Sequence, residues 1–317
     1  MGAEQTVSDI GEFALINAIS ARLTPPSAEN TSVGIGDDSA IISARGGQAV
    51  ACVDMLAQGV HFRLDWSSAN DVGRKAAAQN LADIYAMGAK PTALLVALAL
   101  PADTPVSWVL ELADGLNEEA QKVGVSVVGG DIVRADAITI SVTALGELGD
   151  RTPILRSGAR SGDILAVAGK LGYSAAGLLL LSRGFRSPRA VVNAHRVPEP
   201  AYDLAEQALH ATAMIDISDG LVSDVRHIAK ASGVQARIET DRIQIPADLQ
   251  EVGGAFNEDP LQWILTGGED HAFVATFSDA LSVPKSWNII GHMEEGPAQV
   301  LVDGLLTESG GWDHFGA

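Results

Sequence analysis

The stretch GELGDRTPILRSGARSGD (146–163) interrupts a regular alternation of apolar strands and amphipathic helices, and it decides how the chain is organised. It is rich in Gly, Ser and Arg, a composition typical of an exposed connection between domains. We place a domain boundary there, which gives one domain over 1–150 and another over 151–317. A chain of 317 residues is long enough to give each domain its own hydrophobic core.

The residues on both sides of this stretch follow the same pattern of short apolar runs and longer amphipathic segments. Before it we expect helices over 1–23, 71–87 and 106–122, and strands over 40–42, 48–53, 93–100, 125–128 and 137–145. Two glycines predict a turn at 129–131. After it we expect strands over 164–168, 214–217, 272–276 and 288–291, and helices over 174–182, 199–211 and 219–231. Because some neighbouring strands could form hairpins, the pattern predicts an α+β fold rather than a doubly wound sheet.

The charge of the chain limits its partners. It carries 40 acidic residues against 21 basic ones, a formal net charge of −19. This balance argues against nucleic acid, whose affinity depends on neutralising phosphates with Lys and Arg, and equally against an anionic membrane surface. If so acidic a protein binds phosphorylated ligands, metal ions must separate the two negative partners. The single cysteine, Cys52, excludes an internal disulfide, and the N-terminus lacks the pattern of a signal peptide, so we expect a cytoplasmic protein.

The common nucleotide-binding and catalytic motifs are absent from the sequence. Gly169-Lys170 is followed by Leu171 rather than by the hydroxyl residue of a phosphate-binding loop, and Gly34-x-Gly36 lacks the third glycine of a dinucleotide loop. The sequence also contains no C-x-x-C, H-E-x-x-H or G-x-S-x-G. A phosphate site would therefore need a different set of side chains.

Aspartates recur at the predicted ends of strands and in glycine turns. They are Asp37 and Asp38 in VGIGDDSA (33–40), Asp54 after the strand 48–53, Asp131 after Gly129-Gly130, and Asp216 and Asp219 around Ser218. One such aspartate alone is typical of a local backbone hydrogen bond or of an interaction with a helix dipole. Together, in a chain without a basic phosphate-binding loop, they indicate oxygen ligands for Mg²⁺, which proteins commonly share with substrate phosphates.

Asp83 differs from these aspartates because it lies inside a predicted helix. It shares one helical face with Ala76, Asn80 and Met87, and this stripe carries neither Lys nor Arg. A carboxylate beside a small residue and an amide is unusual for a solvated face, so Asp83 is a further candidate ligand.

Four other places have both a functional and a structural interpretation. His61 in QGVHF (58–62) could bind a ligand or be a half-buried loop histidine. Arg156 could clamp a phosphate with its planar guanidinium or remain a solvated charge. Glu269 follows two glycines in TGGED (266–270), where a turn alone could explain an acid. Trp312 in GGWDHF could cover an apolar patch or stack on a flat ligand.

Nine stretches, in family order, resemble one known family: the bacterial thiamine-monophosphate kinases of the aminoimidazole-ribonucleotide synthetase-like superfamily. The series extends over nearly the whole chain, which makes it far more specific than any one motif. The stretches are GEF (11–13), GIGDDSA (34–40), VDM and GVHF within 53–62, NLADIYAMGA (80–89), VGGD (128–131), RSGARSGD (156–163), IDISDGL (215–221), TGGED (266–270) and WDHF (312–315).

The resemblance implies a two-domain α+β fold. Its N-terminal domain would bind ATP and metal and pair into a homodimer, and its C-terminal α/β domain would complete the substrate site. It also implies ATP-dependent phosphorylation of thiamine monophosphate to thiamine diphosphate, by direct in-line transfer with several Mg²⁺ ions.

The resemblance also assigns roles to residues of this sequence. By motif, the metal ligands would be Asp38, Val53, Asp54, Asp83, Asp131, Asp216 and Asp219. The catalytic set would be Asp38, Asp54, Asp131 and Asp219. Contacts to ATP would come from Gly130, Asp131, Arg156 and Ser218. Contacts to the thiamine substrate would come from His61, Glu269 and Trp312.

The chain departs from the family's pattern at several positions. Cys52 and Val53 stand where hydroxyl residues are usual, so a metal contact there must come from backbone carbonyls. Ile132 replaces the usual Thr after GGD, and His271 stands where Tyr is common. All the carboxylates are present, so the resemblance implies an active enzyme whose metal affinity these changes could alter.

The implied chemistry agrees with the residue types. A phosphate acceptor is already ionised at neutral pH, so it needs no general base, and no Asp-His or Lys base arrangement is evident. Catalysis would then depend on positioning and charge neutralisation. Two alternatives stay open: another ATP-using member of the superfamily that acts on an amide or formyl substrate, and a non-catalytic nucleotide- or metal-binding protein.

Overall fold

The computed structural model describes residues 5–25, 31–33, 35 and 41–307. The chain forms two compact units. Unit 1 consists of Met1–Ile84 with Ala89–Arg151, and unit 2 of Tyr85–Gly88 with Thr152–Ala317. Each unit contains its own main sheet and its own helices. The binding roles predicted for the two halves of the chain stay predictions.

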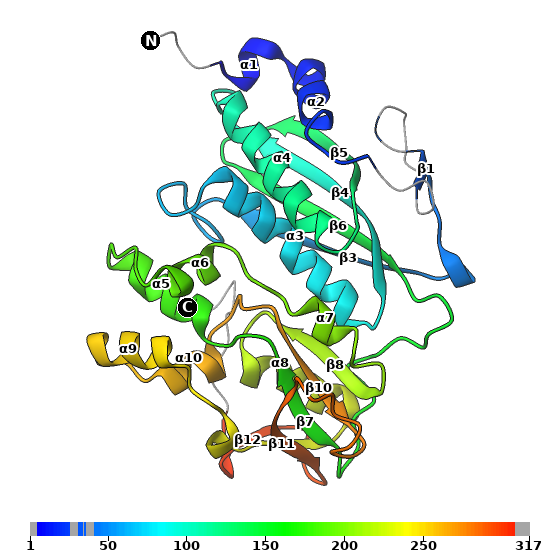
Figure 1. Ribbon diagram of the computed structural model, residues 1–317, viewed down its shortest axis with the longest axis vertical. Helices are drawn as coiled ribbons and strands as arrows, with labels where there is room; N and C mark the ends of the chain where they lie inside the picture. The colour runs from blue at the N-terminus through cyan, green and yellow to red at the C-terminus, as the bar shows by residue number, and fades with distance from the viewer. Residues whose placement is uncertain (1–4, 26–30, 34, 36–40, 308–317) are drawn as a thin grey trace. The chain divides into compact units, whose positions relative to one another are not determined.

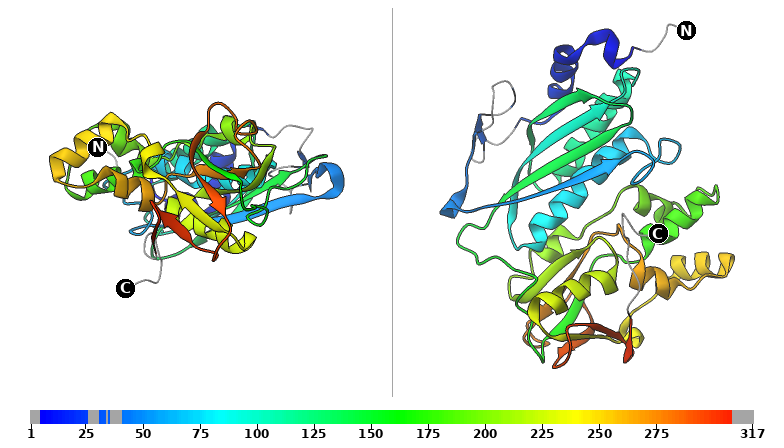
Figure 2. Two further views of the ribbon diagram at one scale, coloured as in Figure 1. Left: turned by 90° about the horizontal axis from the view of Figure 1, so that it is seen from below. Right: turned by 180° about the vertical axis from the view of Figure 1, so that it is seen from behind.

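Unit 1 is built on a four-stranded sheet in the order β3-β6-β4-β5 (Figure 1). Its strands are β3 (Ala49–Ala57), β4 (Lys90–Leu100), β5 (Val127–Arg134) and β6 (Thr139–Glu147). Two long helices, α3 (Ala69–Ala86) and α4 (Val106–Gln121), cover one face, and the view from behind in Figure 2 shows the strands in front of them. The shorter elements are α1 (Val7–Ile10), α2 (Glu12–Ser20), β1 (Thr31–Val33), β2 (Ile41–Ile42) and the 3-10 turn η1 (Arg45–Gly47).

The covered face of this sheet supplies the core of unit 1. Along β6, Ile140, Val142 and Ala144 are buried and alternate with half-exposed neighbours. This period of two is the pattern of a strand with one covered face. The helices contribute fully buried side chains such as Leu81 and Leu112. The sheet and both helices thus form one layered core.

The helices α3 and α4 meet at a reciprocal pair of glycines. A Cβ added to Gly73 would lie 2.2 Å from the carbonyl oxygen of Leu112, and one added to Gly115 would lie 2.1 Å from that of Asn70. Both distances are far shorter than van der Waals contact, so only residues without a side chain allow the two backbones to approach so closely. This contact fixes the position of α3 along α4.

Three expectations for the first half were wrong. The turn predicted at 129–131 is the interior of β5, which pairs in parallel with β4. Asp54 lies in the middle of β3 rather than after its end, because the strand continues to Ala57. The helix expected over 1–23 is interrupted at Gly11, whose φ of +77° is unfavourable for other residues.

Unit 2 contains a seven-stranded sheet in the order β13-β12-β9-β11-β7-β10-β8. Its strands are β7 (Ile164–Ala168), β8 (Ala211–Ile217), β9 (Gln235–Ile238), β10 (Ala272–Phe277), β11 (Asn288–Glu294), β12 (Val300–Val302) and β13 (Leu305–Leu306). Its helices are α5 (Tyr173–Ser182), α6 (Arg189–Arg196), α7 (Tyr202–Ala205), α8 (Leu221–Ser232), α9 (Ala247–Phe256) and α10 (Pro260–Thr266), with the 3-10 turn η2 (Thr240–Arg242).

Strand β10 lies at the centre of the core of unit 2. All six of its residues are buried, and it pairs antiparallel with β7 on one side and β8 on the other. A strand covered on both faces is typically a continuous apolar run, and AFVATF fits this pattern. Leu221, Val225 and Ile228 of α8 belong to the same buried cluster as Ile215 of β8 and Val274 of β10. The core therefore holds the end of β8 and the start of α8 in place.

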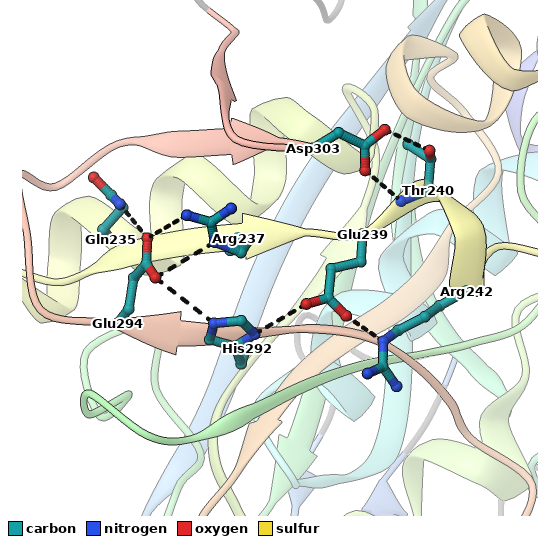
Figure 3. A network of polar contacts seen from close by, with 8 residues as sticks. All are labelled: Gln235, Arg237, Glu239, Thr240, Arg242, His292, Glu294 and Asp303. Atoms are coloured by element: carbon teal, nitrogen blue, oxygen red, sulfur yellow. Dashed lines mark hydrogen bonds and ion pairs between the residues drawn. The ribbon is translucent and has the colours of Figure 1, made fainter.

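A network of polar side chains connects β9, β11 and the turn after β12 (Figure 3). His292 lies between two glutamates, 3.5 Å from Glu239 and 3.7 Å from Glu294. Exposed pairs of this kind stabilise a fold by at most about 1 kcal/mol each. We interpret the network as support for the pairing of β9 with β11. Its members are Gln235, Arg237, Glu239, Thr240, Arg242, His292, Glu294 and Asp303.

The second half also differs from expectation. The helix predicted over 199–211 is reduced to the single turn α7, and β8 already begins at Ala211. Pro198 and Pro200 disfavour a helix at the beginning of that segment. The structure adds helices α6, α9 and α10, which the apolar pattern of the sequence does not predict.

The pairing of strands decides the fold class. Among the described residues, the named strands pair in parallel only between β4 and β5 and between β9 and β12. The predicted two-domain α+β fold is confirmed. No helix in the described part of the chain is both long enough and apolar enough to cross a bilayer.

Candidate functional site

In unit 1, Asp54 and Asp83 lie around the thiol of Cys52. β3 is an edge strand, and the backbone N–H of Asp54 donates to Oδ1 of Asn80 on α3 at 3.0 Å. The thiol donates to the carbonyl oxygen of Asn80 at 3.3 Å. Burial raises the pKa of the Cys52 thiol strongly, and the nearby carboxylates of Asp83 and Asp54 raise it further. A neutral thiol next to two acids therefore marks a place of concentrated negative charge.

Asp131 and Gly130 lie in the middle of β5. The register places Gly130 in the same cross-strand row as Val96 and Asp54, whereas Asp131 belongs to the next row with Ala97. Successive rows send side chains to opposite faces of a sheet, so register alone does not bring the carboxylates of Asp54 and Asp131 together. A Cβ added to Gly130 would lie 1.9 Å from the carbonyl oxygen of Val96, so this position requires glycine.

His61 is held at both its ring and its backbone. The N–H of Ala57 donates to Nδ1 of the ring at 3.0 Å. A nitrogen that accepts a hydrogen bond carries no proton, so the neutral ring has its proton on Nε2. The carbonyl oxygen of His61 accepts from Nζ of Lys75, which is 2% exposed, at 3.0 Å. The backbone of the predicted substrate residue is therefore held by a buried lysine.

In unit 2, Asp216 is buried at the end of β8. One of its carboxylate oxygens lies 3.0 Å from Nδ1 of His271, which is also buried. The sequence analysis noted His271 only as a departure from the family's pattern. The structure shows that it is the partner of a predicted metal ligand.

The junction between β8 and α8 gathers further acids. Asp224, in the first turns of α8, accepts the N–H groups of Asp219 at 3.0 Å and Gly220 at 3.1 Å through one oxygen, Oδ2. Burial raises the pKa of Asp224 to about 7, and the charges of Asp216 and Asp219 add to this effect. Gly220 has a φ of +124° that other residues rarely adopt. A sharp glycine turn thus brings the three carboxyl groups together.

His227 completes this acidic cluster. The ligand atoms of Asp219, Asp224 and His227 lie within 4.8 Å of one another, and these are the only three such side chains to do so in the described ranges. Partial burial lowers the pKa of His227, and the charge of Arg156 lowers it further. The backbone carbonyl of Arg156 accepts from Oγ of Ser232 on α8. The backbone of Arg156 therefore lies at the far end of α8, and its charge acts on His227 of the cluster.

Glu269 is placed beside the same junction by a strained loop. Glu269 and His271 have φ values of +63° and +51°, and such a backbone costs about 1 kcal/mol or more per residue outside glycine. The N–H of Glu269 donates to the carbonyl oxygen of Ser218 at 2.7 Å, and that of His271 to the carbonyl oxygen of Ile217 at 2.9 Å. These bonds hold the loop against the end of β8.

The predicted site residues thus form one group in each unit, and the others are either placed apart from these groups or lie outside the described residues. In unit 1 the structure gathers Asp54 and Asp83 and orients His61. In unit 2 it gathers Asp216, Ser218, Asp219, Glu269 and Arg156. The side chain of Val53 is 61% exposed, so only its backbone could contribute. Asp38 and Trp312 lie outside the described residues, and so does Asp37.

Sequence reasoning missed Asp224 and His227. Both lie inside a helix, where an acid or a histidine carries no distinctive local signal. The one signal was spacing, because Asp224 follows Gly220 by four residues and can therefore reach back to the first N–H groups of the helix.

The donor set suits Mg²⁺. Carboxylate oxygens are the preferred ligands of this ion. Burial is the main cause of the raised pKa of Cys52 and of the pKa of about 7 for Asp224, and the neighbouring carboxylates add to both shifts; a divalent cation would offset this second effect.

Comparison with known proteins covers almost the whole chain. Residues 36–148 match the family model described as AIR synthase related protein, N-terminal domain, and residues 160–304 match the corresponding C-terminal domain. The thiamine-monophosphate kinase of Mycobacterium tuberculosis is 47% identical over 98% of this chain and 93% of its own length. That of Bacillus subtilis is 34% identical over 96% of this chain and 99% of its own.

A solved structure agrees with these relatives. The structure of AaThiL complexed with AMPPCP and TMP is 33% identical to this chain, covers 99% of it and 100% of its own length, and superimposes with a TM-score of 0.82. Both domains, the relatives and the fold therefore agree, and the chain belongs to the thiamine-monophosphate kinase family of AIR synthase related proteins.

Proposed function

We propose that this protein transfers the γ-phosphoryl group of ATP to thiamine monophosphate and so produces thiamine diphosphate. The observation that carries the proposal is the junction after β8, where Asp216, Ser218, Asp219 and Glu269 come together and where the charge of Arg156 acts on the nearby His227. Family membership supports it, since the relatives are named thiamine-monophosphate kinases and AaThiL was solved with AMPPCP and TMP.

The chemistry asks little of the protein beyond positioning. The acceptor oxygen of thiamine monophosphate is ionised at neutral pH, so no residue has to remove a proton from it. Arg156 would bind phosphate oxygens through its planar guanidinium. Gly130 and Ser218 would contact the nucleotide, and the lack of a Cβ at Gly130 lets a backbone approach closely. These residues would align the two phosphates for in-line transfer.

Mg²⁺ fits the acidic residues as the cofactor. Several such ions would bind, and their ligands would be Asp38, Asp54, Asp83, Asp131, Asp216 and Asp219, with the backbone carbonyl of Val53. When bound, Mg²⁺ supplies charge neutralisation between two polyanions and stabilises the charge on the transferred phosphoryl group.

The thiamine moiety would bind through three residues. The carboxylate of Glu269 is a suitable neighbour for the positively charged thiazolium ring. Trp312 would stack on this cation. His61 would contribute the N–H of Nε2 as a hydrogen-bond donor, since Nδ1 already accepts from Ala57.

We also propose that the protein acts as a homodimer in the cytoplasm. The pairing of N-terminal domains in the family supports the dimer, and the single cysteine suits a reducing compartment. Light scattering on the purified chain should give about twice its 32.9 kDa mass, and a monomer at micromolar concentration would overturn this part.

The test of the reaction is incubation with ATP, Mg²⁺ and thiamine monophosphate, followed by ³¹P NMR. We expect the phosphomonoester signal to be replaced by the two signals of a diphosphate. Parallel samples with EDTA, or with thiamine in place of its monophosphate, should show no product. Binding of ATP without turnover would favour the non-catalytic alternative. Turnover of ATP only with an amide or formyl substrate would favour the other branch of the superfamily.

A further inference from the structure

In unit 2 a series of polar contacts connects the buried Asp270 with Glu269. It begins at Asp270, whose Oδ1 accepts the N–H of Ser174 at 2.8 Å and whose Oδ2 accepts that of Gly172 at 2.6 Å. Oγ of Ser174, a residue 1% exposed, lies 3.0 Å from Nδ1 of His195. The same Nδ1 lies 3.8 Å from Oε2 of Glu269. The start of α5, the end of α6 and the loop before β10 thus meet at one imidazole ring.

The position of His195 is fixed by the packing of α6 on α5. A Cβ added to Gly177 of α5 would lie 2.6 Å from the carbonyl oxygen of Val191 and 2.8 Å from Cβ of His195. The helices can approach this closely only because residue 177 is glycine. His195 itself is 8% exposed. Its ring is therefore buried at a fixed place and has little freedom to turn away from Glu269.

Glu269 has the opposite character. Its side chain is 32% exposed, and its backbone N–H donates to the carbonyl oxygen of Ser218 at the β8–α8 junction. A glutamate has three side-chain torsions, and ordering a long side chain at the moment of binding weakens affinity. A carboxylate already restrained on one oxygen loses less freedom when a ligand arrives.

We propose that His195 is a positioning residue that holds the carboxylate of Glu269 toward the cationic ring of thiamine monophosphate. The inference depends on the proposed function, because it takes the contact between Glu269 and the thiazolium from it. Nδ1 of His195 faces the Ser174 hydroxyl at 3.0 Å and Oε2 of Glu269 at 3.8 Å, and the second contact would set the direction of the carboxylate. His195 acts through Glu269 and does not itself touch the reacting atoms.

The test compares three variants by steady-state kinetics. His195→Ala removes the ring. His195→Asn keeps a polar group near the position of Nδ1. Val192→Ala, on the same helix and fully buried, is the control for loosened packing. We expect His195→Ala to raise KM for thiamine monophosphate about tenfold, as is common when the support of a binding group is removed. KM for ATP should stay the same and kcat within about twofold.

The conservative variant separates positioning from packing. His195→Asn should keep KM for thiamine monophosphate within about threefold of the wild type, and Val192→Ala should leave it unchanged. Equal increases in both KM values, or an Asn variant as impaired as the Ala variant, would overturn the proposal. A double-mutant cycle with Glu269→Gln should be strongly non-additive, because His195 acts only through that carboxylate. Additive effects would contradict the mechanism.

Binding measurements keep this inference distinct from the proposed reaction. Isothermal titration of thiamine monophosphate into each variant needs no turnover. A wild type that binds this ligand but is inactive would contradict the proposed reaction and leave the role of His195 testable by binding. An analogue with an uncharged ring in place of the thiazolium should bind wild type and His195→Ala equally well. If His195→Ala weakens binding of the uncharged analogue as much as binding of thiamine monophosphate, then His195 supports the shape of the pocket and does not act through the charge of Glu269. If His195→Ala does not fold, Ser174→Ala tests the same connection, with a smaller rise in KM expected and no change contradicting it.

Discussion

In unit 1 the carboxylates of Asp54 and Asp83 lie beside the thiol of the half-buried Cys52, whereas in unit 2 those of Asp216, Asp219 and Asp224 gather at one junction between a strand and a helix. Both clusters concentrate negative charge, but the group whose pKa is raised is a thiol in unit 1 and a carboxyl group in unit 2. The Cys52 thiol stays neutral near pH 7 and adds no charge. The pKa of Asp224 is about 7, so the charge of the junction changes close to neutral pH.

The comparison teaches that the same acidic composition can be organised in two ways. The unit 1 cluster depends on strand register and on Asn80, an amide on the facing helix. The unit 2 cluster depends on a glycine turn whose N–H groups bond to an acid. The variants below break or sharpen this contrast, in order of decreasing effect.

Removing one carboxylate charge from either unit should have the largest effect. Asp54→Asn in unit 1 and Asp216→Asn in unit 2 should each lower kcat about 100-fold, the size expected when a group that stabilises transition-state charge is lost. The measurement is the rate of thiamine diphosphate formation at saturating ATP. Asp150→Asn, an exposed acid near the predicted domain boundary, is the control and should keep wild-type activity. Unchanged kcat in Asp54→Asn and Asp216→Asn would mean that these acids are structural.

Two buried aspartates of unit 2 form a matched pair for stability. Asp270 accepts one N–H on each oxygen, so Asp270→Asn places an amide nitrogen against a backbone donor and should destabilise the fold by about 2 kcal/mol when measured at about pH 5. Asp224 accepts both of its N–H groups on Oδ2, so the single oxygen of Asn can replace it, and Asp224→Asn should change stability by less than about 1 kcal/mol. Urea denaturation followed by circular dichroism measures both, and equal losses would contradict the assignment of the oxygens.

The difference between wild type and Asp270→Asn should depend on pH. Burial raises the pKa of Asp270 from 3.8 to about 7. Because the folded protein binds this proton more tightly than the unfolded chain, wild type loses stability relative to the variant as pH rises from about 4 to 7, by at most about 1.4 kcal/mol per pH unit. Unfolding free energies at pH 5, 6 and 7 test this, and a stability difference that grows with pH would contradict it.

Cys52→Ser should have the smallest effect. Serine keeps a donor for the carbonyl oxygen of Asn80 and adds an oxygen next to Asp54 and Asp83. We expect the Mg²⁺ concentration for half-maximal activity to fall a few-fold, since oxygen is a better ligand than a neutral thiol for this ion. Cys52→Ala, which has neither property, is the control. If the Mg²⁺ concentration for half-maximal activity rises equally in Cys52→Ser and Cys52→Ala, position 52 acts only through packing.

Much of the fold could be predicted from periodicity, and the exceptions have physical causes. The helices at 71–87 and 106–122 differ from α3 and α4 by only a residue or two at each end, because their amphipathic patterns are long. Gly129-Gly130 predicted a turn, but strand pairing prevailed. The missing side chain at Gly130 lets β5 pack against the backbone of β4, a tertiary fact that two glycines alone do not disclose.

The candidate site could be predicted less completely than the fold. Motif order brought Asp216, Ser218, Asp219 and Glu269 into one hypothesis, and the structure gathers these four in unit 2. The supporting residues were out of reach because each is distant in sequence from the group it holds. His195 is 74 positions from Glu269, and His271 is 55 from Asp216. Such pairings follow from packing and have no local signature.

The reciprocal glycines between α3 and α4 have a consequence for mutational tolerance. Gly73 is ten residues before Asp83 on the same helix, a separation of about 15 Å at 1.5 Å per residue. A methyl group at Gly73 or Gly115 would push the helices apart and carry Asn80 and Asp83 with them. In an alanine scan, substitutions at these two glycines should therefore lower activity through the packing of α3 on α4. The position of the Asp83 side chain thus depends on a helix–helix contact about three turns away along α3. A larger residue at either glycine would be tolerated only if both helices moved together.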